Sequence, residues 1–279
     1  MQRDPEVLTF KDLEPYLLLK NGNFLYKIPY QDGWAVLKVY YGSRGQVGRV
    51  TKSISNILAG QTSYMPKTRL RIERECLNLW SEHGFRVFKT YDHVEVRAPQ
   101  CPAGGYILFE YVEAPRPVHY LPDDSIDVEE RFRTYHRFLP VWARRHELAI
   151  RLREPRLVHE NGDFKHVYIL EDEFLWFDFE MVYRNPAHVE YYVAHEILQY
   201  LWHILRQLTP ELGERLLEET IAGYPDSERL GSTFRFFHSS PNPLHRFARA
   251  LDRRFSKRAR KPTSKYNVAQ RVQDKLSHN

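Results

Sequence analysis

Polar residues able to do chemistry gather in residues 157–180, which have the sequence LVHENGDFKHVYILEDEFLWFDFE. Asn161 and Asp163 lie in a polar loop that runs into an apolar segment, and Asp178 follows a second apolar segment after an acidic turn. This pattern predicts a hairpin. A rigid hairpin with one loop residue beside a reacting hydroxyl and one carboxylate on Mg²⁺ is the arrangement that phosphoryl transfer requires.

Asp178 is the first candidate ligand for a metal ion. It follows the apolar run Phe-Leu-Trp-Phe and precedes Phe179 and Glu180. A carboxylate at the end of a buried strand costs free energy unless it is paired with a cation or binds a metal ion. We therefore predict Mg²⁺ at Asp178, and the alternative is an Asp that caps the next loop.

Lys38 lies inside an otherwise apolar strand, residues 35–39. An ammonium there needs either an escape to water or an anionic partner. One interpretation is an edge-strand lysine that points to solvent. The other pairs Lys38 with a carboxylate on the following helix, where Glu73 and Glu75 are available, and with nucleotide phosphates.

The first third of the chain has the pattern of antiparallel strands. Asn21-Gly22-Asn23 carries a hairpin signal between residues 16–20 and 24–30, and a further turn leads into residues 34–41. Residues 42–69 are rich in Gly, Ser and basic groups, so we expect an insertion over the sheet.

A helix is predicted over residues 70–83, because apolar positions recur at helical spacing and Gly84 follows them. Residues 87–96 and 106–112 are predicted to be further strands. The Pro-rich residues 114–122 mark the expected boundary between two lobes, because proline interrupts regular structure.

Beyond this boundary the pattern is mostly helical. Helices are predicted over residues 128–152, 188–208, 210–224 and 244–255. We expect an α+β fold made of an N-terminal lobe with a small antiparallel sheet and one helix, a mostly helical C-terminal lobe, and a basic C-terminal tail. Their predicted limits are 1–113, 114–252 and 253–279.

Composition limits the class of protein. The 279 residues carry 41 basic and 36 acidic side chains, a net charge of +5 that favours anionic partners. The only cysteines, Cys76 and Cys101, match no metal or redox pattern, so we expect a reducing compartment and no disulfide framework. The first residues lack the apolar core of a signal peptide, and nowhere do 18 apolar residues follow one another. The expected location is cytoplasmic.

A family resemblance follows from the order of these residues. Lys38 on a third strand, Glu73 on a helix, a strand ending at Glu110, the His159 loop and Asp178 occur in the order of the protein-kinase-like fold. From about residue 15 to 208 the chain resembles the bacterial lipopolysaccharide core kinases, especially the heptose kinases. These have a Gly-rich basic insertion after the strand lysine, similar to Tyr41-Gly42-Ser43-Arg44-Gly45 here.

The resemblance implies a bilobal kinase fold that binds ATP and Mg²⁺. Its helix carries a Glu eleven residues before a Gly, which selects Glu73 over Glu75 because Gly84 stands at that spacing. Lys38 and Glu73 would then hold the nucleotide phosphates. Glu110 and Val112 would lie at the strand end beside adenine, which backbone groups contact in such kinases.

The catalytic loop aligns without gaps when His159-Glu160-Asn161 is matched to His-Arg-Asp of the family. This match implies His166 as a metal ligand, as in the heptose kinases. Seventeen residues separate Asn161 from Asp178, close to the spacing in kinase-like folds, whereas fifteen separate Asp163 from Asp178. Asn161 therefore stands where a catalytic Asp is expected.

Asn161 can accept a hydrogen bond from a hydroxyl, but it cannot take its proton. Asp163 is the available substitute, and its alternative role is a loop carboxylate bonded to backbone amides. Lys165 could contact the transferring phosphate or face solvent. Glu196 stands where a helix carboxylate steadies the loop in such kinases.

Two features leave the function open. A Gly-x-Gly-x-x-Gly signature is absent between the first strands, and the Asn161 side chain cannot act as a base. A pseudokinase that binds nucleotide or a partner without turnover is therefore the main alternative. An atypical kinase acting on protein or a small molecule is another, because a fold does not name the acceptor.

Basic residues are concentrated in residues 44–71 and 253–275. The second stretch is either a solvated tail or a contact for anionic lipid head groups. Nucleic acid is not expected, because no recognition motif accompanies the charge. The expected function is ATP-dependent phosphorylation of a sugar hydroxyl on a lipid-linked glycan, such as lipopolysaccharide core, with peripheral contact at the inner face of the cytoplasmic membrane.

Overall fold

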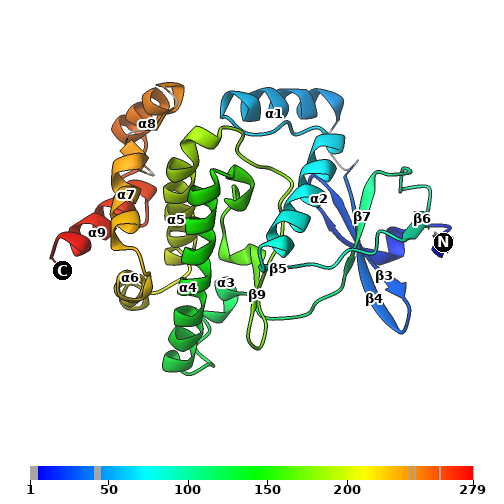
Figure 1. Ribbon diagram of the computed structural model, residues 1–279, viewed down its shortest axis with the longest axis horizontal. Coiled ribbons are helices and arrows are strands. Elements are labelled where there is room, and N and C mark those ends of the chain that lie inside the picture. The colour runs from blue at the N-terminus through cyan, green and yellow to red at the C-terminus, as the bar shows by residue number, and fades with distance from the viewer. Residues whose placement is uncertain (1–5, 41–44, 239, 242, 258, 279) are drawn as a thin grey trace. The chain divides into compact units, whose positions relative to one another are not determined.

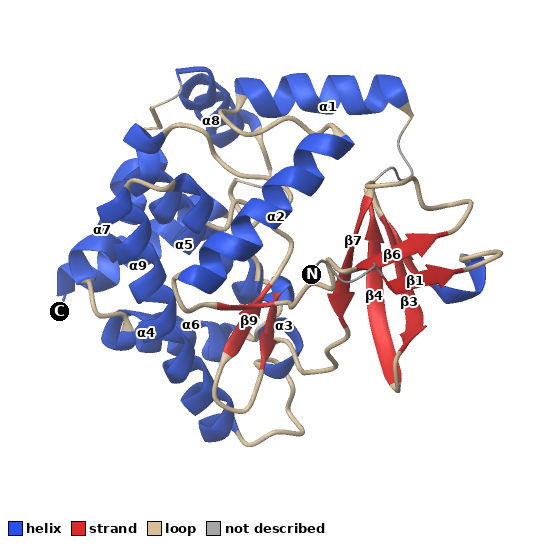
Figure 2. Ribbon diagram, turned by 45° about the vertical axis from the view of Figure 1, so that its right-hand side comes forward, coloured by secondary structure: helices blue, strands red, loops and turns tan. Residues whose placement is uncertain are grey.

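The computed structural model describes residues 6–40, 45–238, 240–241, 243–257 and 259–278. The chain divides into two compact units, Met1–Glu113 and Ala114–Asn279 (Figure 1). Strands dominate the first unit and helices the second (Figure 2). The predicted fold class, an antiparallel-sheet N-terminal region and a mostly helical C-terminal part, is confirmed.

The N-terminal unit is built on a four-stranded antiparallel sheet in the order β2-β3-β4-β7. These strands are β2 (Leu17–Lys20), β3 (Phe24–Tyr30), β4 (Gly33–Val39) and β7 (Tyr106–Glu110). Alternation along β4 buries Ala35, Leu37 and Val39 in one core cluster, as expected for a strand of period two. A small parallel pair, β1 (Glu6–Thr9) with β6 (Val94–Arg97), adds Val94 and Val96 to that cluster.

Two helices follow the sheet lysine. Most of the predicted insertion is helical: α1 spans Gln46–Leu58, and α2 begins four residues earlier than expected and spans Pro66–Glu82. The prediction missed α1 because Gly48 and several β-branched residues lower its helix propensity. Residues 41–44, which open the Gly-rich insertion, lie outside the described part of the chain.

The strand predicted over residues 87–96 is two short strands. They are β5 (Arg86–Val87) and β6, separated by the turn at Tyr91, whose carbonyl accepts from the Val94 amide at 3.1 Å. The apolar residues over which one strand was predicted therefore belong to two different strand pairs.

The C-terminal unit is organised around α4 and α5. The long helix α4 (Val128–Leu152) begins at Asp127, whose carboxylate accepts from the amides of Glu129 and Glu130 at 3.0 and 3.1 Å. Such an N-cap satisfies amides that have no partner within the helix. The other helices are α3 (Pro117–Tyr120), α5 (Val189–Leu205), α6 (Pro210–Gly223), α7 (Ser227–His238), α8 (Pro243–Phe255) and α9 (Lys265–His278).

The predicted hairpin is present as β8 (Val167–Ile169) and β9 (Phe174–Trp176), preceded by the short helix η3 (Phe164–His166). Its core side chains pack on α4: the ring centroid of Phe138 lies 5.1 Å from that of Phe164 and 5.9 Å from that of Trp176. Buried aromatic contacts of this kind hold the hairpin rigidly on the helix.

The end of the chain differs from the predicted tail. Helix α9 packs on α5 and α7 and buries Val268, Ala269 and Val272. Its basic residues are engaged with α6: Lys275 lies 2.9 Å from Glu218, and Arg271 pairs with Glu214. Residues 265–278 therefore belong to the helical unit, because apolar residues at helical spacing between the charges give them a buried face.

Candidate functional site

Lys38 and Glu73 form a buried ion pair in the N-terminal unit. Nζ of Lys38 on β4 lies 2.7 Å from Oε2 of Glu73 on α2, and only 7% and 2% of the two residues is exposed. The hydroxyl of Tyr40 donates to the same carboxylate oxygen. The predicted pairing with Glu73 is confirmed, whereas Glu75 makes a surface ion pair with Arg71.

A buried ion pair of this kind adds little net stability, because removing two charges from water offsets most of their attraction. Its value is geometric: Glu73 and the wall of β4 fix the direction of the Lys38 ammonium. An ammonium oriented by a carboxylate is what phosphoryl-transfer enzymes use to hold nucleotide phosphates.

The loop between β2 and β3 is fixed to the same helix. One nitrogen of Arg69 on α2 donates to the carbonyls of Tyr40 and Gly22, at 3.0 and 3.3 Å, and its guanidinium lies over the ring of Tyr64 at 4.3 Å. Gly22 has φ 75°, and a Cβ there would lie 2.5 Å from the Tyr64 hydroxyl oxygen. The sequence analysis missed Arg69, although it precedes Glu73 by one helical turn and so shares its face.

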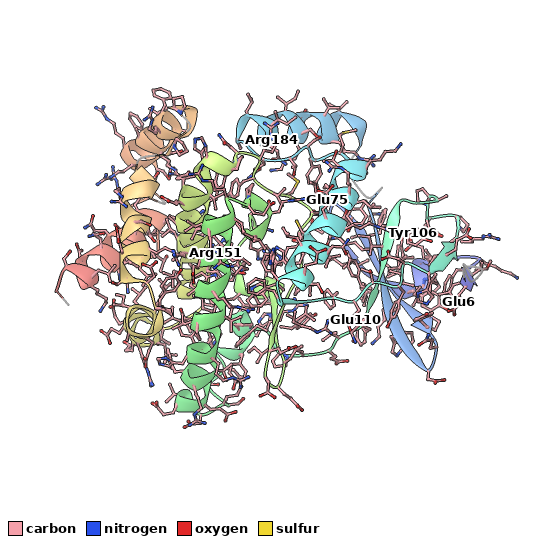
Figure 3. All side chains as sticks on the ribbon, in the orientation of Figure 1. Glu6, Glu75, Tyr106, Glu110, Arg151 and Arg184 are labelled. Carbon is pink, nitrogen blue, oxygen red and sulfur yellow. The ribbon has the colours of Figure 1, made fainter. Side chains whose placement is uncertain are left out.

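The predicted adenine-side residues lie at the end of β7. The Glu110 carboxylate accepts from Arg86 at 2.6 Å and from the Lys89 amide at 2.8 Å, so this side chain ties the strand end to the segment before it (Figure 3). Val112 follows the strand and is half-buried. The contact of their backbone groups with adenine stays a prediction.

In the C-terminal unit, Glu196 on α5 holds the loop that opens at His159. Oε2 of Glu196 accepts from the His159 amide at 2.6 Å, and Nδ1 of His159 lies 2.9 Å from the Tyr200 hydroxyl. Burial, with a smaller effect from His166, lowers the pKa of His159 to about 4, so its ring is neutral at pH 7. Glu196 thus takes the place in the fold that the resemblance assigned to it.

Three residues of α4 also contact the Glu196 carboxylate. Its oxygens accept from Nη1 of Arg145 at 3.0 Å and from Nε1 of Trp142 at 3.1 Å, and His146 lies 3.3 Å away. Burial alone would raise the pKa of Glu196, but the charges of Arg145 and His146 outweigh it and hold the pKa well below its usual range. The sequence offered one signal for this cluster, a charged residue at a core position of α4.

The loop lies directly on α5 at Gly162. A Cβ at this position would lie 2.8 Å from Cε2 of Tyr200 and 3.0 Å from Cγ of Glu196, closer than carbon atoms approach. Glycine is therefore required here by space.

Asp163, one of the two candidate catalytic residues, is buried and engaged. One oxygen accepts from the Lys165 amide at 3.0 Å, which caps η3, and the other is hydrogen-bonded to His203 of α5. Burial opposes ionisation, but these hydrogen bonds hold the pKa of Asp163 well below its usual range. A carboxylate of this kind is a weak base, so the contacts favour its structural role.

Lys165 is exposed, and its ammonium lies 3.4 Å from Asp163. His203 was missed, because forty residues separate it from Asp163 and its position on α5 carries no local signal. The other candidate catalytic residue, Asn161, is exposed on the loop.

His166 and Asp178 are brought together by the hairpin. Nδ1 of His166 lies 3.0 Å from the Asn161 carbonyl oxygen, which only accepts, so Nδ1 carries the proton and donates. Nε2 is then the nitrogen with a lone pair, and it lies 3.4 Å from Oδ2 of Asp178. Burial lowers the pKa of His166, although the Asp178 carboxylate opposes this shift, and the ring is neutral.

The backbone at Asp178 has φ 73°, in the left-handed region. Aspartate is one of the few residues other than glycine that adopt it, and backbone strain of this kind is found at functional sites. The turn directs the carboxylate to His166 directly after the buried strand β9.

This pair fits a divalent cation. Two ligands of one octahedral ion lie about 3 Å apart, close to the observed separation, and the backbone carbonyl that fixes the imidazole is the usual second-shell arrangement. Among the residues that the structure describes, no group of three or more His, Cys, Asp or Glu is placed to enclose a metal ion. A two-ligand set suits an ion that takes its other ligands from phosphates and water.

Comparisons with known proteins find distant likenesses among solved structures. No protein-family profile matches the sequence, and no curated protein matches it. The solved structures that resemble the chain include two complexes. One is an amicoumacin kinase, hAmiN, in complex with AMP-PNP, Ca²⁺ and Ami, and the other is WaaP in complex with acyl carrier protein.

Each likeness covers 96% of this chain at 14% identity, with 90% and 87% of the two proteins covered and TM-scores of 0.42 and 0.33. Similarity this low assigns no activity or substrate to this chain.

Proposed function

We propose that this protein is an ATP-dependent phosphotransferase that acts on an alcohol group. The observation that carries the proposal is the pair His166 and Asp178, with the lone pair of the imidazole turned toward the carboxylate by the Asn161 carbonyl. These two side chains would hold Mg²⁺ or a similar divalent ion. Such an ion, when bound, neutralises charge on the nucleotide phosphates.

The N-terminal unit would supply the nucleotide contacts. The Lys38 ammonium, held by Glu73, would bind phosphate oxygens, and backbone groups at Glu110 and Val112 would meet adenine. Loop residues 21–23 are held in place by Arg69, which favours a preorganised strand loop despite the missing glycine signature. These assignments rest on the buried charge of Lys38 and on the position of each residue in its unit.

In the C-terminal unit, the exposed Asn161 would accept a hydrogen bond from the acceptor hydroxyl, and Lys165 would contact the transferring phosphate. Asp163 is engaged by His203, so no strong base stands in the loop. Phosphoryl transfer through a loose transition state depends mainly on positioning and charge stabilisation, and it can proceed slowly without one.

The proposed acceptor is a sugar hydroxyl of a lipid-linked glycan such as lipopolysaccharide core, at the cytoplasmic face of the membrane. The basic balance of the chain and its sequence resemblance to lipopolysaccharide core kinases support this class. Within the described part of the chain, no helix is both long and apolar enough to cross a bilayer. Contact with the membrane would then be peripheral.

The test measures transfer of labelled γ-phosphate from ATP to extracted lipopolysaccharide core, to free sugars and to proteins, with a divalent ion present. We expect transfer to the lipid-linked glycan above the other acceptors. Transfer only to protein or to a free small molecule would support the phosphotransferase activity but contradict the proposed acceptor.

A second candidate function is a pseudokinase that binds nucleotide without turnover. The observations that favour it are Asn161 at the position of the base and the engagement of Asp163 by His203. ATP binding without transfer to any of the three acceptors, together with a gain of transfer on Asn161→Asp, would establish this alternative.

A further inference from the structure

Helix α8 exposes an apolar stripe. Phe247 is 66% exposed, Leu251 42% and Phe255 70%, and their spacing of four residues places them along one side of the helix. Soluble proteins normally bury a stripe of this kind. Figure 1 shows α8 at the edge of the helical unit, next to α7.

The opposite side of α8 is attached to the unit. Arg249 donates to the Tyr191 hydroxyl at 2.8 Å, and the Tyr266 hydroxyl oxygen of α9 lies 3.1 Å from both the Arg249 carbonyl oxygen and the Asp252 carboxylate, which share its proton. Position 249 lies across the helix from the stripe and position 252 lies to one side of it, so the Arg249 contacts direct the stripe outward.

The charge around the stripe is basic. Arg246, Arg253 and Arg254 are exposed, and Lys257 follows the helix. The only acidic residue of α8, Asp252, is exposed at one side of the stripe and is bonded to the Tyr266 hydroxyl. An apolar stripe on a helix whose exposed charged side chains are three arginines and one aspartate is the composition of a helix that lies in the interface of an anionic bilayer.

The basic residues of α9 do not offer such a surface. Arg271 and Lys275 are paired with carboxylates of α6, and the apolar side of α9 is buried. Of the two basic elements at the end of the chain, α8 alone combines exposed cations with exposed apolar side chains.

We propose that α8 binds the surface of an anionic membrane, with the stripe in the acyl boundary and the arginines on lipid phosphates. The relevance of this contact to a lipid-linked acceptor rests on the proposed function, but the contact itself does not. It would hold the C-terminal unit at the surface on which such an acceptor is found.

The experiment measures partition of the full chain onto vesicles of phosphatidylcholine alone or mixed with phosphatidylglycerol. We expect binding to the anionic vesicles that falls as salt is raised. The triple variant Phe247→Ser, Leu251→Ser, Phe255→Ser should lose about tenfold or more in affinity. Replacing Arg246, Arg253 and Arg254 by Gln should lose about a hundredfold, since each cation near an anionic surface contributes about 1 kcal/mol.

Two matched variants control for the general loss of exposed apolar area. Leu18→Ser with Leu19→Ser removes side chains that are 54% and 51% exposed on β2, and it should leave the affinity unchanged. Val47→Ser with Val50→Ser and Ile54→Ser removes the exposed stripe of α1, a helix that also carries two basic residues, Arg49 and Lys52, and it should leave the affinity unchanged. Loss of binding on the α1 variant, with the α8 variant unaffected, would overturn the assignment to α8.

Equal binding to neutral and anionic vesicles, or an unchanged affinity of the α8 triple variant, would also overturn it. Sedimentation without lipid tests whether a second copy of the chain binds the stripe instead. A dimer that the α8 variant converts to a monomer would show this and overturn the proposal. Vesicle binding needs neither ATP nor an acceptor. An absence of phosphate transfer would therefore not contradict membrane binding by α8. An absence of vesicle binding would not contradict the phosphotransferase activity.

Discussion

The Lys38 ammonium forms a buried ion pair with the Glu73 carboxylate. Replacing Glu73 by Gln keeps the shape of that side chain but removes the negative charge 2.7 Å from the buried ammonium. We expect the free energy of unfolding to fall by about 3 kcal/mol and the affinity for ATP to fall with it. Urea denaturation and nucleotide titration measure the two effects.

Glu75→Gln is the matched control, because Glu75 is the same residue type two positions further along α2. Its ion pair with Arg71 is at the surface, so unfolding should change by less than about 1 kcal/mol. Equal losses in the two variants would contradict a special role for the buried pair.

Asp163 allows a second test at the residue scale. Since it caps η3 and is bonded to His203, Asp163→Asn should lower the free energy of unfolding by about 1 to 2 kcal/mol and leave kcat within about tenfold of the wild type. Steady-state kinetics on the folded fraction provide the comparison. A fall in kcat of about a thousandfold at unchanged stability would instead make Asp163 the base.

The sequence predicted those residues of the site whose signal is local. The break between apolar strand and loop selected Asp178, and the family resemblance selected Glu73 by its spacing to Gly84. His203 and Arg69 left no such signal, because their partners Asp163 and Gly22 are distant in sequence. The resemblance supplied His166, but the proton on its Nδ1 follows only from the contact with a carbonyl.

At the scale of elements, α4 and α5 are joined by a buried cluster that includes His146, and burial shifts the pKa of this histidine. Burial lowers the pKa of His146 to about 4, against about 6.5 in an unfolded chain, although Glu196 opposes the shift. The unfolded state therefore binds more protons between these values. Stability from His146 is full above pH 6.5, falls as pH drops toward 4, and amounts to about 3 kcal/mol.

We expect His146→Gln to flatten this part of the stability curve. The free energy of unfolding would be measured by urea denaturation at several values between pH 7 and pH 4. His93→Gln, at an exposed position of the N-terminal unit, is the control. Between pH 7 and pH 4 its free energy of unfolding should fall as much as that of the wild type. A wild-type slope retained in the His146 variant would show that other groups cause the loss.

The helices of the C-terminal unit were predicted almost to the residue where capping signals are strong. Asp127 before α4 and Pro210 at the start of α6 are such signals. Helix α1 lacks them, and its apolar residues face outward, so neither capping nor burial distinguishes it from a loop in sequence. The separation of β5 from β6 depends on pairing with different strands, which sequence does not record.

At the scale of the whole molecule, the end of the chain is part of the helical unit. Val272 is 2% exposed in α9, so Val272→Ala should lower the free energy of unfolding by about 2 kcal/mol. Ser277→Ala, on the exposed side of the same helix, should change it by less than about 0.5 kcal/mol. Equal and negligible effects in the two variants would show that residues 265–278 form a solvated tail and are not packed on the helical unit.

Each unit contains one set of the groups that phosphoryl transfer requires. The N-terminal unit has the oriented ammonium of Lys38, and the C-terminal unit has the pair His166 and Asp178. The presence of Lys38, Glu73 and Asp178 in one chain is the strongest reason to expect turnover and not binding alone, because a site without function has no physical need for three buried or half-buried charged groups.

The most direct test is consumption of ATP with a divalent ion and the acceptor that supports transfer, compared between the wild type and Asp178→Ala. Circular dichroism and urea denaturation would show that both proteins are folded. We expect the variant to lose about a hundredfold or more in rate, because the carboxylate is the charged ligand of the ion. Equal rates for the two proteins would contradict the metal assignment, and with it the proposed centre of the reaction.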